Sequence, residues 1–445
     1  MGAPVEALSR GILWEATARP APETRPLSGE IDTKVLVIGG GYTGLSAALH
    51  VAREKGDVTV VEAFGIGHGG SGRNAGHCTP TFQHVTLAGL RKRLGPVWGE
   101  RAIAMQTGAA AYVFDLIRTH GMECEAAENG FLQCAHSLSA LDMLSARCAE
   151  YNEAGMRGRM VGQPEISALT GSSSYSGAWF LESAGHLNPL GYARGLAKSA
   201  LHYGARIYTG TPIVSLASSG RRWRATTLHG SINAEKVIVA TGAHTGQLWP
   251  GLRKTFLLAE VACMASFPLA AEHRKVVLPK NNHVLDTRGD FTNFRLDRDG
   301  RLITSVFVEG RRGGDAQGTM KRMSNRFARI FPMLPKLEWE YYWFGKVDLH
   351  PATFPQFMDL APGATAALGY SSRGVPTATV MGRELARHAL GVDPAELSVP
   401  LVKMQAVPQL LSLAPRVLLP YYRMKDVVGG WVDRLRPKAA AEDMG

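Results

Sequence analysis

The sequence predicts a mixed α/β fold built around a buried parallel sheet. Three short apolar, β-branched segments carry this prediction, because strands buried on both faces form continuous hydrophobic runs. They are residues 34–40 (KVLVIGG), 57–63 (DVTVVEA) and 236–246 (KVIVATGAHTG). A helix expected from about Tyr42 to Arg53 joins the first two, so that strand, helix and strand form one βαβ unit of about 30 residues.

The remaining elements are expected in a simple order along the chain. Residues 1–30 are rich in Pro, Ala and Glu and are expected to run over the surface before the first strand. Residues 90–160 indicate mostly helix, interrupted by a strand at 131–135. Further helices are expected at 190–205 and 375–390, further strands at 206–210 and 364–370, and antiparallel strands within 256–310.

Length and composition bound the class of protein. The chain has 445 residues, enough for two or three domains of ~100–200 residues or for a discontinuous pair. Hydrophobic residues make up 45% and charged residues 20%, as in soluble globular proteins, which excludes disorder as the main state. No apolar run is long enough to span a bilayer, so we expect no membrane helix, and we expect no secretory signal because charged residues interrupt the first 20 residues.

The five cysteines are scattered and odd in number. They cannot staple a chain of this length, which excludes a small disulfide scaffold. The sequence has no CxxC pair and no HExxH motif, so no metal site is expected. Reduced thiols are typical of a cytoplasmic protein, and we expect that location.

The first glycine cluster, residues 39–44, reads GGGYTG and fits the GxGxxG pattern. Gly39 allows a tight turn, Gly41 lets a pyrophosphate approach the backbone, and Gly44 lets the following helix pack closely on the strand. The N-terminus of that helix aims free N–H groups at phosphate. Glu62 ends the second strand about 20 residues later, where an acid accepts ribose hydroxyls and disfavours a 2′-phosphate. The cluster therefore predicts a dinucleotide site that does not prefer NADP.

Three later features of the sequence, the second made of two separate stretches, are not required in a domain that binds only NAD. Residues 67–78 (GHGGSGRNAGHC) can lay backbone donors and one cation along a long anionic cofactor. In a FAD fold, residues 212–216 and 237–246 would flank the adenine and close the nucleotide site. Residues 369–376 (GYSSRGVP) precede a helix whose positive N-terminus can face the flavin ring where charge collects on reduction.

These segments carry a family resemblance. VLVIGGGYTGLSAALHVA (35–52), GGSGRNAG (69–76), NPLGYARGLA (188–197), VIVATGAHTG (237–246), NFRLDRDGRLI (293–303) and GYSSRGV (369–375) occur in this order. The chain resembles the D-amino-acid oxidase superfamily of FAD enzymes, which includes glycine, sarcosine and γ-glutamylputrescine oxidases. The first two segments are most similar to the γ-glutamylputrescine oxidase branch, and the pipecolate oxidases look equally close. The resemblance covers roughly residues 10–395 and is poorly specific for substrate.

The resemblance implies a Rossmann-type FAD-binding domain of separated segments, into which a substrate domain of mixed or antiparallel sheet and helices is inserted. We expect the FAD-binding domain at 31–115, 186–255 and 360–395, the substrate domain at 116–185 and 256–359, an N-terminal arm at 1–30 and a C-terminal extension at 396–445. The cofactor-binding residues expected on this basis are Gly39, Gly41, Tyr42, Thr43, Gly44, Glu62, Ala63, Ser71, Gly72, Arg73, Asn74, Ala75, Gly76, Val214, Thr241, Gly242, Gly369, Ser372, Arg373, Gly374 and Val375.

The resemblance also implies a reaction. The enzyme would oxidise the C–N bond of a small amine or amino acid, such as pipecolate, sarcosine or γ-glutamylputrescine, by hydride transfer to flavin N5, with O2 or a quinone as acceptor. The imine product would then be hydrolysed or released. Two alternatives stay open: a membrane-associated FAD dehydrogenase of an opine or hydroxy acid that reduces quinone, and a NAD-binding protein without flavin.

Departures from the family pattern define the candidate site. Some relatives attach FAD through a late cysteine, but none follows Cys263, and Asn74 stands where others use a histidine. We therefore expect non-covalent FAD, although His77 and Cys78 keep an unusual link open. Glycine oxidases hold the carboxylate with an arginine in a segment that matches residues 344–351, which contain none. The candidates to replace it are Arg373, Arg295 and Lys346.

The net charge of +11 completes the sequence-based expectations. The chain has no long Lys/Arg run and no nucleic-acid motif, so we expect no nucleic-acid partner. Residues 409–438 mix apolar stretches with basic residues, among them Arg416, Arg423, Lys425, Arg434 and Arg436, and can lie peripherally on the inner face of a membrane. The alternative is a C-terminal helix packed on the body of the protein.

Overall fold

The computed structural model describes residues 10–83, 85–308, 315–408 and 410–411. The chain divides into two compact units. Among the described residues, the first comprises those within 10–128, 183–263 and 341–408, and the second comprises those within 129–182, 264–340 and 410–411. The expected C-terminal segment 409–438 lies outside the described residues apart from Leu410 and Leu411.

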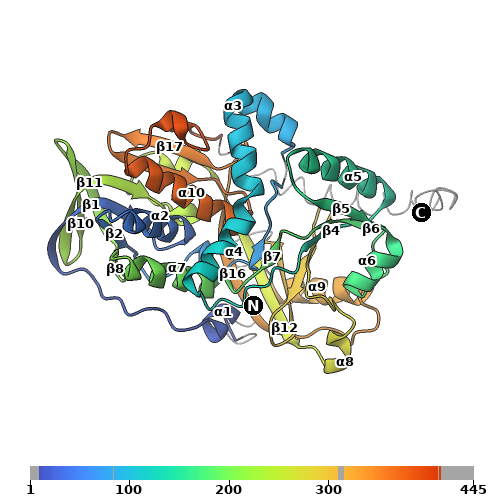
Figure 1. Ribbon diagram of the computed structural model, residues 1–445. Coiled ribbons are helices and arrows are strands. Elements are labelled where there is room, and N and C mark those ends of the chain that lie inside the picture. The colour runs from blue at the N-terminus through green and yellow to red at the C-terminus, as the bar shows by residue number, and fades with distance from the viewer. Residues whose placement is uncertain (1–9, 84, 309–314, 409, 412–445) are drawn as a thin grey trace. The chain divides into compact units, whose positions relative to one another are not determined.

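A nine-stranded sheet forms the centre of the first unit (Figure 1). Its main path runs β19-β17-β18-β11-β1-β2-β8, and β9 and β10 extend β11 as an antiparallel meander. Strands β18, β11, β1, β2 and β8 are parallel, as the apolar runs predict. The bounds are β1 Gly29–Ile38, β2 Val58–Val61, β8 Arg206–Tyr208, β9 Ile213–Ser219, β10 Arg222–Thr227, β11 Gly230–Val239, β17 Gln356–Ala361, β18 Ala364–Leu368 and β19 Leu401–Lys403.

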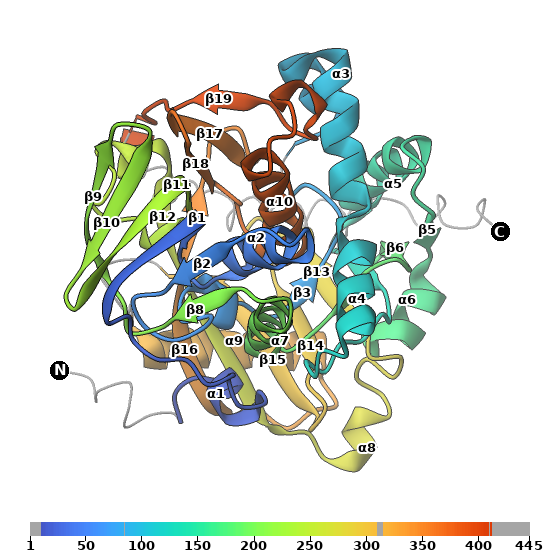
Figure 2. The same ribbon diagram turned by 60° about the vertical axis from the view of Figure 1, so that its left-hand side comes forward.

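Helices cover one face of this sheet. Figure 2 shows α2, α7 and α10 side by side, and they are in contact with one another. The Ser46 hydroxyl on α2 donates to the Thr379 carbonyl on α10 at 2.7 Å, which fixes the two helices together. The helices of the unit are α1 Leu13–Thr17, α2 Tyr42–Arg53, α3 Leu87–Thr107, α4 Ala109–His120, α7 Pro189–His202 and α10 Gly374–Ala389, with a small β3–β7 pair at His77–Cys78 and Gly185–His186. The expected helices at 42–53, 190–205 and 375–390 are confirmed.

The opposite face of the sheet carries an apolar core. Strand alternation places Leu36 and Ile38 of β1 on this side, where they pack with Trp223 and Ala225 of the meander and with Phe256. Both faces of the central strands are therefore covered, which explains why their sequences are continuously hydrophobic.

The N-terminal segment is anchored, contrary to the expectation that it runs over the surface. Trp14 on α1 is fully buried, and Leu27 is 2% exposed. The Trp14 indole N–H donates to the Asn74 carbonyl at 2.9 Å. The composition of the segment hid these large apolar side chains among prolines and charges, and burying them outweighs the polar average of the segment.

An eight-stranded mixed sheet forms the centre of the second unit, in the order β16-β12-β15-β14-β13-β4-β6-β5. The chain passes between the units inside β12 and β16. The expected strand at 131–135 and the antiparallel strands within 256–310 are confirmed. The bounds are β4 Phe131–Ala135, β5 Gly158–Val161, β6 Gly177–Leu181, β12 Leu257–Pro268, β13 His283–Asp286, β14 Asn293–Leu296, β15 Arg301–Phe307 and β16 Trp339–Leu349, with helices α5 Leu138–Glu153, α6 Gln163–Thr170, α8 Ala271–Arg274 and α9 Ala316–Ile330. Within the described residues, no helix combines the length and apolar character needed to cross a bilayer.

Candidate functional site

The first glycine loop joins β1 to α2 inside the first unit. Gly39 has φ +116°, and a Cβ atom added there would lie 2.5 Å from the Ala240 carbonyl oxygen. A Cβ at Gly44 would collide with the Gly39 carbonyl. Both positions therefore require glycine, and the loop delivers the N-terminus of α2 directly at Tyr42.

Glu62 lies against this loop at the end of β2. One carboxylate oxygen accepts the Gly40 N–H at 2.6 Å, and the other accepts the Phe64 N–H at 2.9 Å. These two bonds fix the plane of the carboxylate beside the glycine turn. A carboxylate has about four acceptor sites, so two remain for hydroxyl groups of a ligand.

The second glycine loop packs directly on the first. The Ser71 hydroxyl accepts the Tyr42 N–H at 3.0 Å. The Asn74 amide nitrogen donates to the Gly70 and Ser71 carbonyls, and its oxygen accepts the Gly76 N–H at 2.8 Å. Asn74 therefore closes the loop on itself, a task that its amide suits because it both donates and accepts.

Arg73 braces the same loop. Its Nε donates to the His68 carbonyl at 2.8 Å, and Nη1 donates to the Phe344 carbonyl at 3.3 Å. The Trp343 indole N–H donates to the Arg73 carbonyl at 2.8 Å, and the Trp343 ring meets that of Trp14 edge to face at 5.8 Å. The two tryptophans thus support the loop through its backbone. The sequence interpretation missed Trp14, because the only signal was a lone tryptophan in a polar segment.

The third glycine loop, residues 369–374, lies against the first. The Tyr370 and Thr43 hydroxyls are 2.7 Å apart and share a hydrogen bond. Gly369 has φ +88°, and Ser371 and Ser372 also adopt positive φ of 50° and 68°. This backbone turns the chain from β18 into α10 and places Arg373 at the N-cap position of α10.

The segment after β11 is the fourth segment that lies beside the glycine loops. Ala240 and the Thr241 backbone lie beside Gly39, and the Thr241 and Thr245 hydroxyls are 2.7 Å apart. The four segments at 39–44, 71–76, 240–242 and 369–374 therefore lie next to one another although they are far apart in the sequence. Val214, expected near an adenine, lies on the same sheet at the start of β9 and is 56% exposed.

This group of loops fits a dinucleotide. The Gly39 and Gly40 N–H groups bind the Val61 carbonyl and Glu62, so the donors for a ligand are the Gly41 N–H and the N–H groups of the first turn of α2, which carry positive partial charge. Glu62 stands at the end of the neighbouring strand β2. The donor set matches a pyrophosphate next to a ribose, and a side chain larger than hydrogen is excluded at Gly39 and Gly44 by backbone atoms.

The three candidate carboxylate-binding cations lie in different places. Arg373 precedes α10, and Lys346 lies on β16, whose backbone passes the second loop: a Cβ at Gly70 would lie 3.2 Å from the Lys346 carbonyl oxygen. Both belong to the first unit. Arg295 lies on β14 in the second unit, is 2% exposed, and donates to the Leu296 carbonyl at 3.2 Å.

The cysteines are all unpaired and buried. Cys78 is completely buried in β3, and burial raises the pKa of its thiol well above the usual range. A neutral, enclosed thiol is a poor nucleophile, so the position of Cys78 gives no support to a covalent flavin link. Within the residues that the structure covers, no cluster of His, Cys, Asp or Glu could hold a metal ion.

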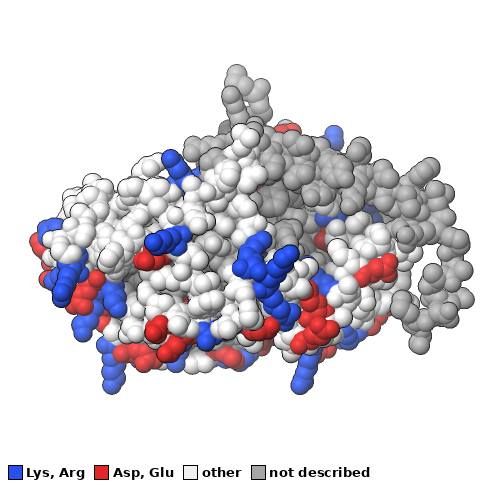
Figure 3. All heavy atoms as spheres, turned by 90° about the horizontal axis from the view of Figure 1, so that it is seen from above, with Lys and Arg blue, Asp and Glu red and all other residues white. Residues whose placement is uncertain are grey.

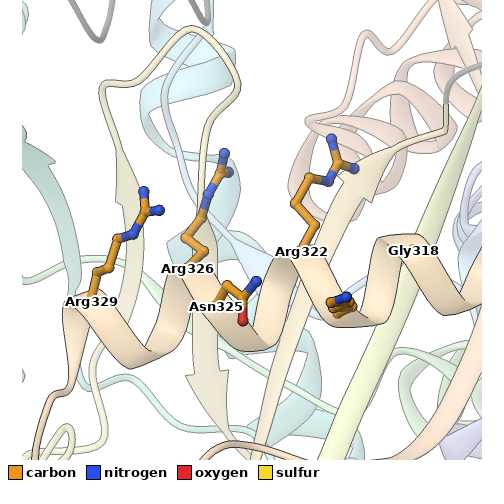
Figure 4. A pocket seen from close by; sticks show the side chains of 6 residues that line it. Gly318, Arg322, Asn325, Arg326 and Arg329 are labelled. Carbon is orange, nitrogen blue, oxygen red and sulfur yellow. The ribbon is translucent and has the colours of Figure 1, made fainter.

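A separate basic surface lies on α9 in the second unit. Figure 4 shows Arg322, Arg326 and Arg329 pointing to the same side of the helix, where they line a hollow together with Gly318, Lys321 and Asn325. Asp290 is 3.0 Å from Arg326 and 3.7 Å from Arg322, so it neutralises part of this charge.

The net positive charge does not form one field over the face in Figure 3, where basic and acidic side chains alternate. Ion pairs between exposed side chains, such as Arg206–Asp57 and Arg224–Glu30, also neutralise part of the surface charge.

Comparison with known proteins identifies the family. A family model described as FAD dependent oxidoreductase (DAO) matches residues 34–388. The chain belongs to this family. It is therefore a FAD-dependent oxidoreductase, and the glycine loops described above lie within the matched region.

Relatives extend this similarity over most of the chain. Probable oxidoreductase OrdL of Rhizobium meliloti is 30% identical over 86% of this chain and 89% of its own length. Gamma-glutamylputrescine oxidoreductase of Escherichia coli is 28% identical over 85% of this chain and 88% of its own length. The crystal structure of glycine oxidase from Geobacillus kaustophilus shares the fold with a TM-score of 0.68, at 18% identity, over 81% of this chain and 95% of that one.

Proposed function

We propose that this enzyme oxidises the C–N bond of a small amine or amino acid, either a secondary amino acid of the pipecolate or sarcosine kind or a γ-glutamylputrescine-like amine. The observation that carries the proposal is the meeting of the three glycine loops at Tyr42–Ser71 and Thr43–Tyr370. The relatives named for γ-glutamylputrescine and glycine support the amine class.

In this proposal the first unit binds FAD without a covalent bond. Gly39, Gly41 and the first turn of α2 contact the pyrophosphate, and Glu62 accepts the ribose hydroxyls. Residues 71–76 and 241–242 enclose the cofactor, and residues 369–374 face the flavin ring. The FAD-binding segments are 31–115, 186–255 and 360–395, and the substrate-binding segments are 116–185 and 256–359.

Bound FAD supplies the hydride acceptor, and the protein supplies binding and orientation. The N-terminus of α10 places its positive end beside the ring, where it stabilises negative charge. Arg373 and Lys346, which both belong to the first unit, would hold the substrate carboxylate so that the C–H bond next to nitrogen faces the flavin, and Arg295 of the second unit stays a separate candidate for this role. The neutral amine would give up a hydride to the flavin and become an iminium ion, which would lose a proton to give the imine or be hydrolysed by water to a carbonyl compound and an amine.

Anaerobic bleaching of the purified flavoprotein tests the proposal. The panel contains pipecolate, proline, sarcosine, glycine and γ-glutamylputrescine, with lactate and glycerol phosphate as hydroxy compounds. We expect one or more amines to bleach the flavin absorption and the hydroxy compounds to leave it unchanged. Bleaching by a hydroxy compound alone would replace the amine with an alcohol substrate, and a protein that neither contains nor takes up FAD would refute the cofactor assignment.

The same preparation identifies the electron acceptor. Reduced enzyme is mixed with air-saturated buffer or, without oxygen, with a soluble quinone. Rapid recovery of the flavin absorption in air indicates an oxidase, and recovery only with quinone indicates a dehydrogenase. We propose peripheral membrane contact only for the second outcome, and binding to anionic vesicles would then test it.

A further inference from the structure

Asp348 is a buried carboxylate near the end of β16, and it is 6% exposed. One of its carboxylate oxygens accepts the Gly369 N–H at 2.6 Å, and its backbone carbonyl accepts the Ser371 N–H at 3.0 Å. Asp348 therefore accepts hydrogen bonds from two residues of the third loop, Gly369 and Ser371. Both contacts lie inside the first unit.

The loop that Asp348 grips has a strained backbone. Ser371 and Ser372 have positive φ, which costs free energy in residues with a Cβ atom and persists only where the surroundings enforce it. The His350 N–H donates to the Ser371 hydroxyl at 3.1 Å, and a Cβ at Gly369 would lie 2.8 Å from the His350 Cβ. The end of β16 therefore restrains the backbone of the third loop.

We propose that Asp348 is a positioning residue, which holds residues 369–374 and the N-terminus of α10 in the conformation needed beside the flavin. This inference rests on the proposed function for the location of the flavin ring, and it adds a residue that acts through the backbone. Arg373 directly precedes α10, so the contacts of Asp348 with the third loop also set the direction from which the Arg373 guanidinium approaches a substrate.

Burial makes the charge of the Asp348 carboxylate sensitive to pH. Loss of hydration raises the pKa of Asp348 to about 6, and hydrogen bonds from backbone N–H groups, that of Gly369 first, oppose the rise. The titratable groups beside it are the Tyr370 phenol, whose pKa is also raised by burial, and His350, whose pKa burial and Arg93 lower. As pH falls through about 6, the carboxyl takes up a proton and accepts the Gly369 N–H more weakly.

The test compares the wild-type holoenzyme with Asp348→Asn. Asparagine keeps the size of the side chain, removes the charge, and brings an NH2 group into the position of the carboxylate. Hydrogen exchange of residues 369–374 is measured in the holoprotein and in the apoprotein. Sulfite, which adds to oxidised flavins and leaves negative charge on the ring, reports the environment of the flavin without any substrate.

We expect exchange at Gly369 and Ser371 to become at least about tenfold faster in Asp348→Asn, since a charge-assisted hydrogen bond is lost. The sulfite dissociation constant should rise about tenfold as the N-terminus of α10 loses its fixed position. The pH dependence of sulfite affinity, corrected for the ionisation of bisulfite itself, should lose the contribution of the Asp348 carboxyl. Asp359→Asn on β17, an exposed carboxylate two strands from β11, is the matched control and should leave all three readouts unchanged.

Unchanged exchange in Asp348→Asn, or a sulfite profile identical to that of the wild type, would overturn the proposal. If the variant does not fold, Ser371→Ala replaces it, because it removes the acceptor of the His350 N–H and leaves Asp348 in place. Normal exchange in Ser371→Ala would then contradict the proposed restraint of the third loop by β16. Failure of the amine panel leaves these results intact, so the two proposals fail separately.

Discussion

Gly41→Val tests the position of the cofactor pyrophosphate. Gly41 has φ −92° and ψ −175°, an extended conformation that valine adopts readily, so backbone strain cannot cause the effect. The added Cβ would lie 2.9 Å from the Ser71 hydroxyl and next to the N–H groups of the first loop. The valine side chain would therefore occupy the volume that we assign to the phosphates.

The expected loss follows from the hydrogen bonds that the valine blocks. Two backbone N–H groups directed at a charged phosphate are each worth roughly 1.5–3 kcal/mol. Losing both costs about 3–6 kcal/mol, which corresponds to an increase in the FAD dissociation constant of about 10² to 10⁴. Titration of the apoprotein with FAD, followed by flavin fluorescence, measures this change directly.

A double variant separates the two causes of the loss. Ser71→Ala removes the only atom within 3 Å of the new Cβ at Gly41 among the described neighbours. If the phosphate occupies the site, Gly41→Val weakens FAD binding just as strongly in the Ser71→Ala background. Recovery of affinity in the double variant would assign the defect to the serine, and normal flavin content in Gly41→Val alone would refute the placement. Gly162→Val, where no atom lies within 4 Å of the added Cβ, should bind FAD normally.

Two further predictions address the substrate and the thiols. Arg373→Ala should raise KM for an acidic substrate about 10- to 100-fold, the value of one charged hydrogen-bonded contact, and should hardly change KM for the corresponding amide. Steady-state kinetics with the acid and its amide measure this, and equal effects on both would remove Arg373 from the carboxylate role. The five cysteines, whose thiols burial keeps protonated, should react with a thiol reagent at neutral pH only after denaturant is added. Rapid reaction of a thiol in the native holoprotein would contradict their burial.

Local patterns were sufficient to predict the βαβ unit that carries the first glycine loop. The helix at Tyr42–Arg53 was expected with the bounds that the structure shows, because a glycine cluster begins it and one apolar face defines its length. Glu62 and the two flanking strands could be placed because βαβ geometry fixes the spacing of the elements. In such a unit, neighbours in space are close in sequence.

The supports of the site could not be predicted in this way. Trp14 reaches the second loop across 60 residues, and Asp348 reaches the third loop across 21 residues from a different strand. Neither contact leaves a periodic trace, since each depends on one side chain and on the path of a distant backbone. The contact between the Asp348 carboxylate and the Gly369 N–H became visible only with the fold.

Strand β16 carries residues that contact both the second and the third glycine loop. Trp343 binds the Arg73 carbonyl of the second loop, while Asp348 holds Gly369 of the third. Lys346, a candidate for the substrate carboxylate, lies between them on the same strand. A displacement of β16 would therefore shift both loops and this candidate cation together, whereas a change at Gly41 alters the contact with Ser71 and the contact that we propose with the cofactor. We accordingly expect substitutions along β16 to change FAD environment and substrate KM in parallel, and substitutions in the first loop to change FAD affinity alone.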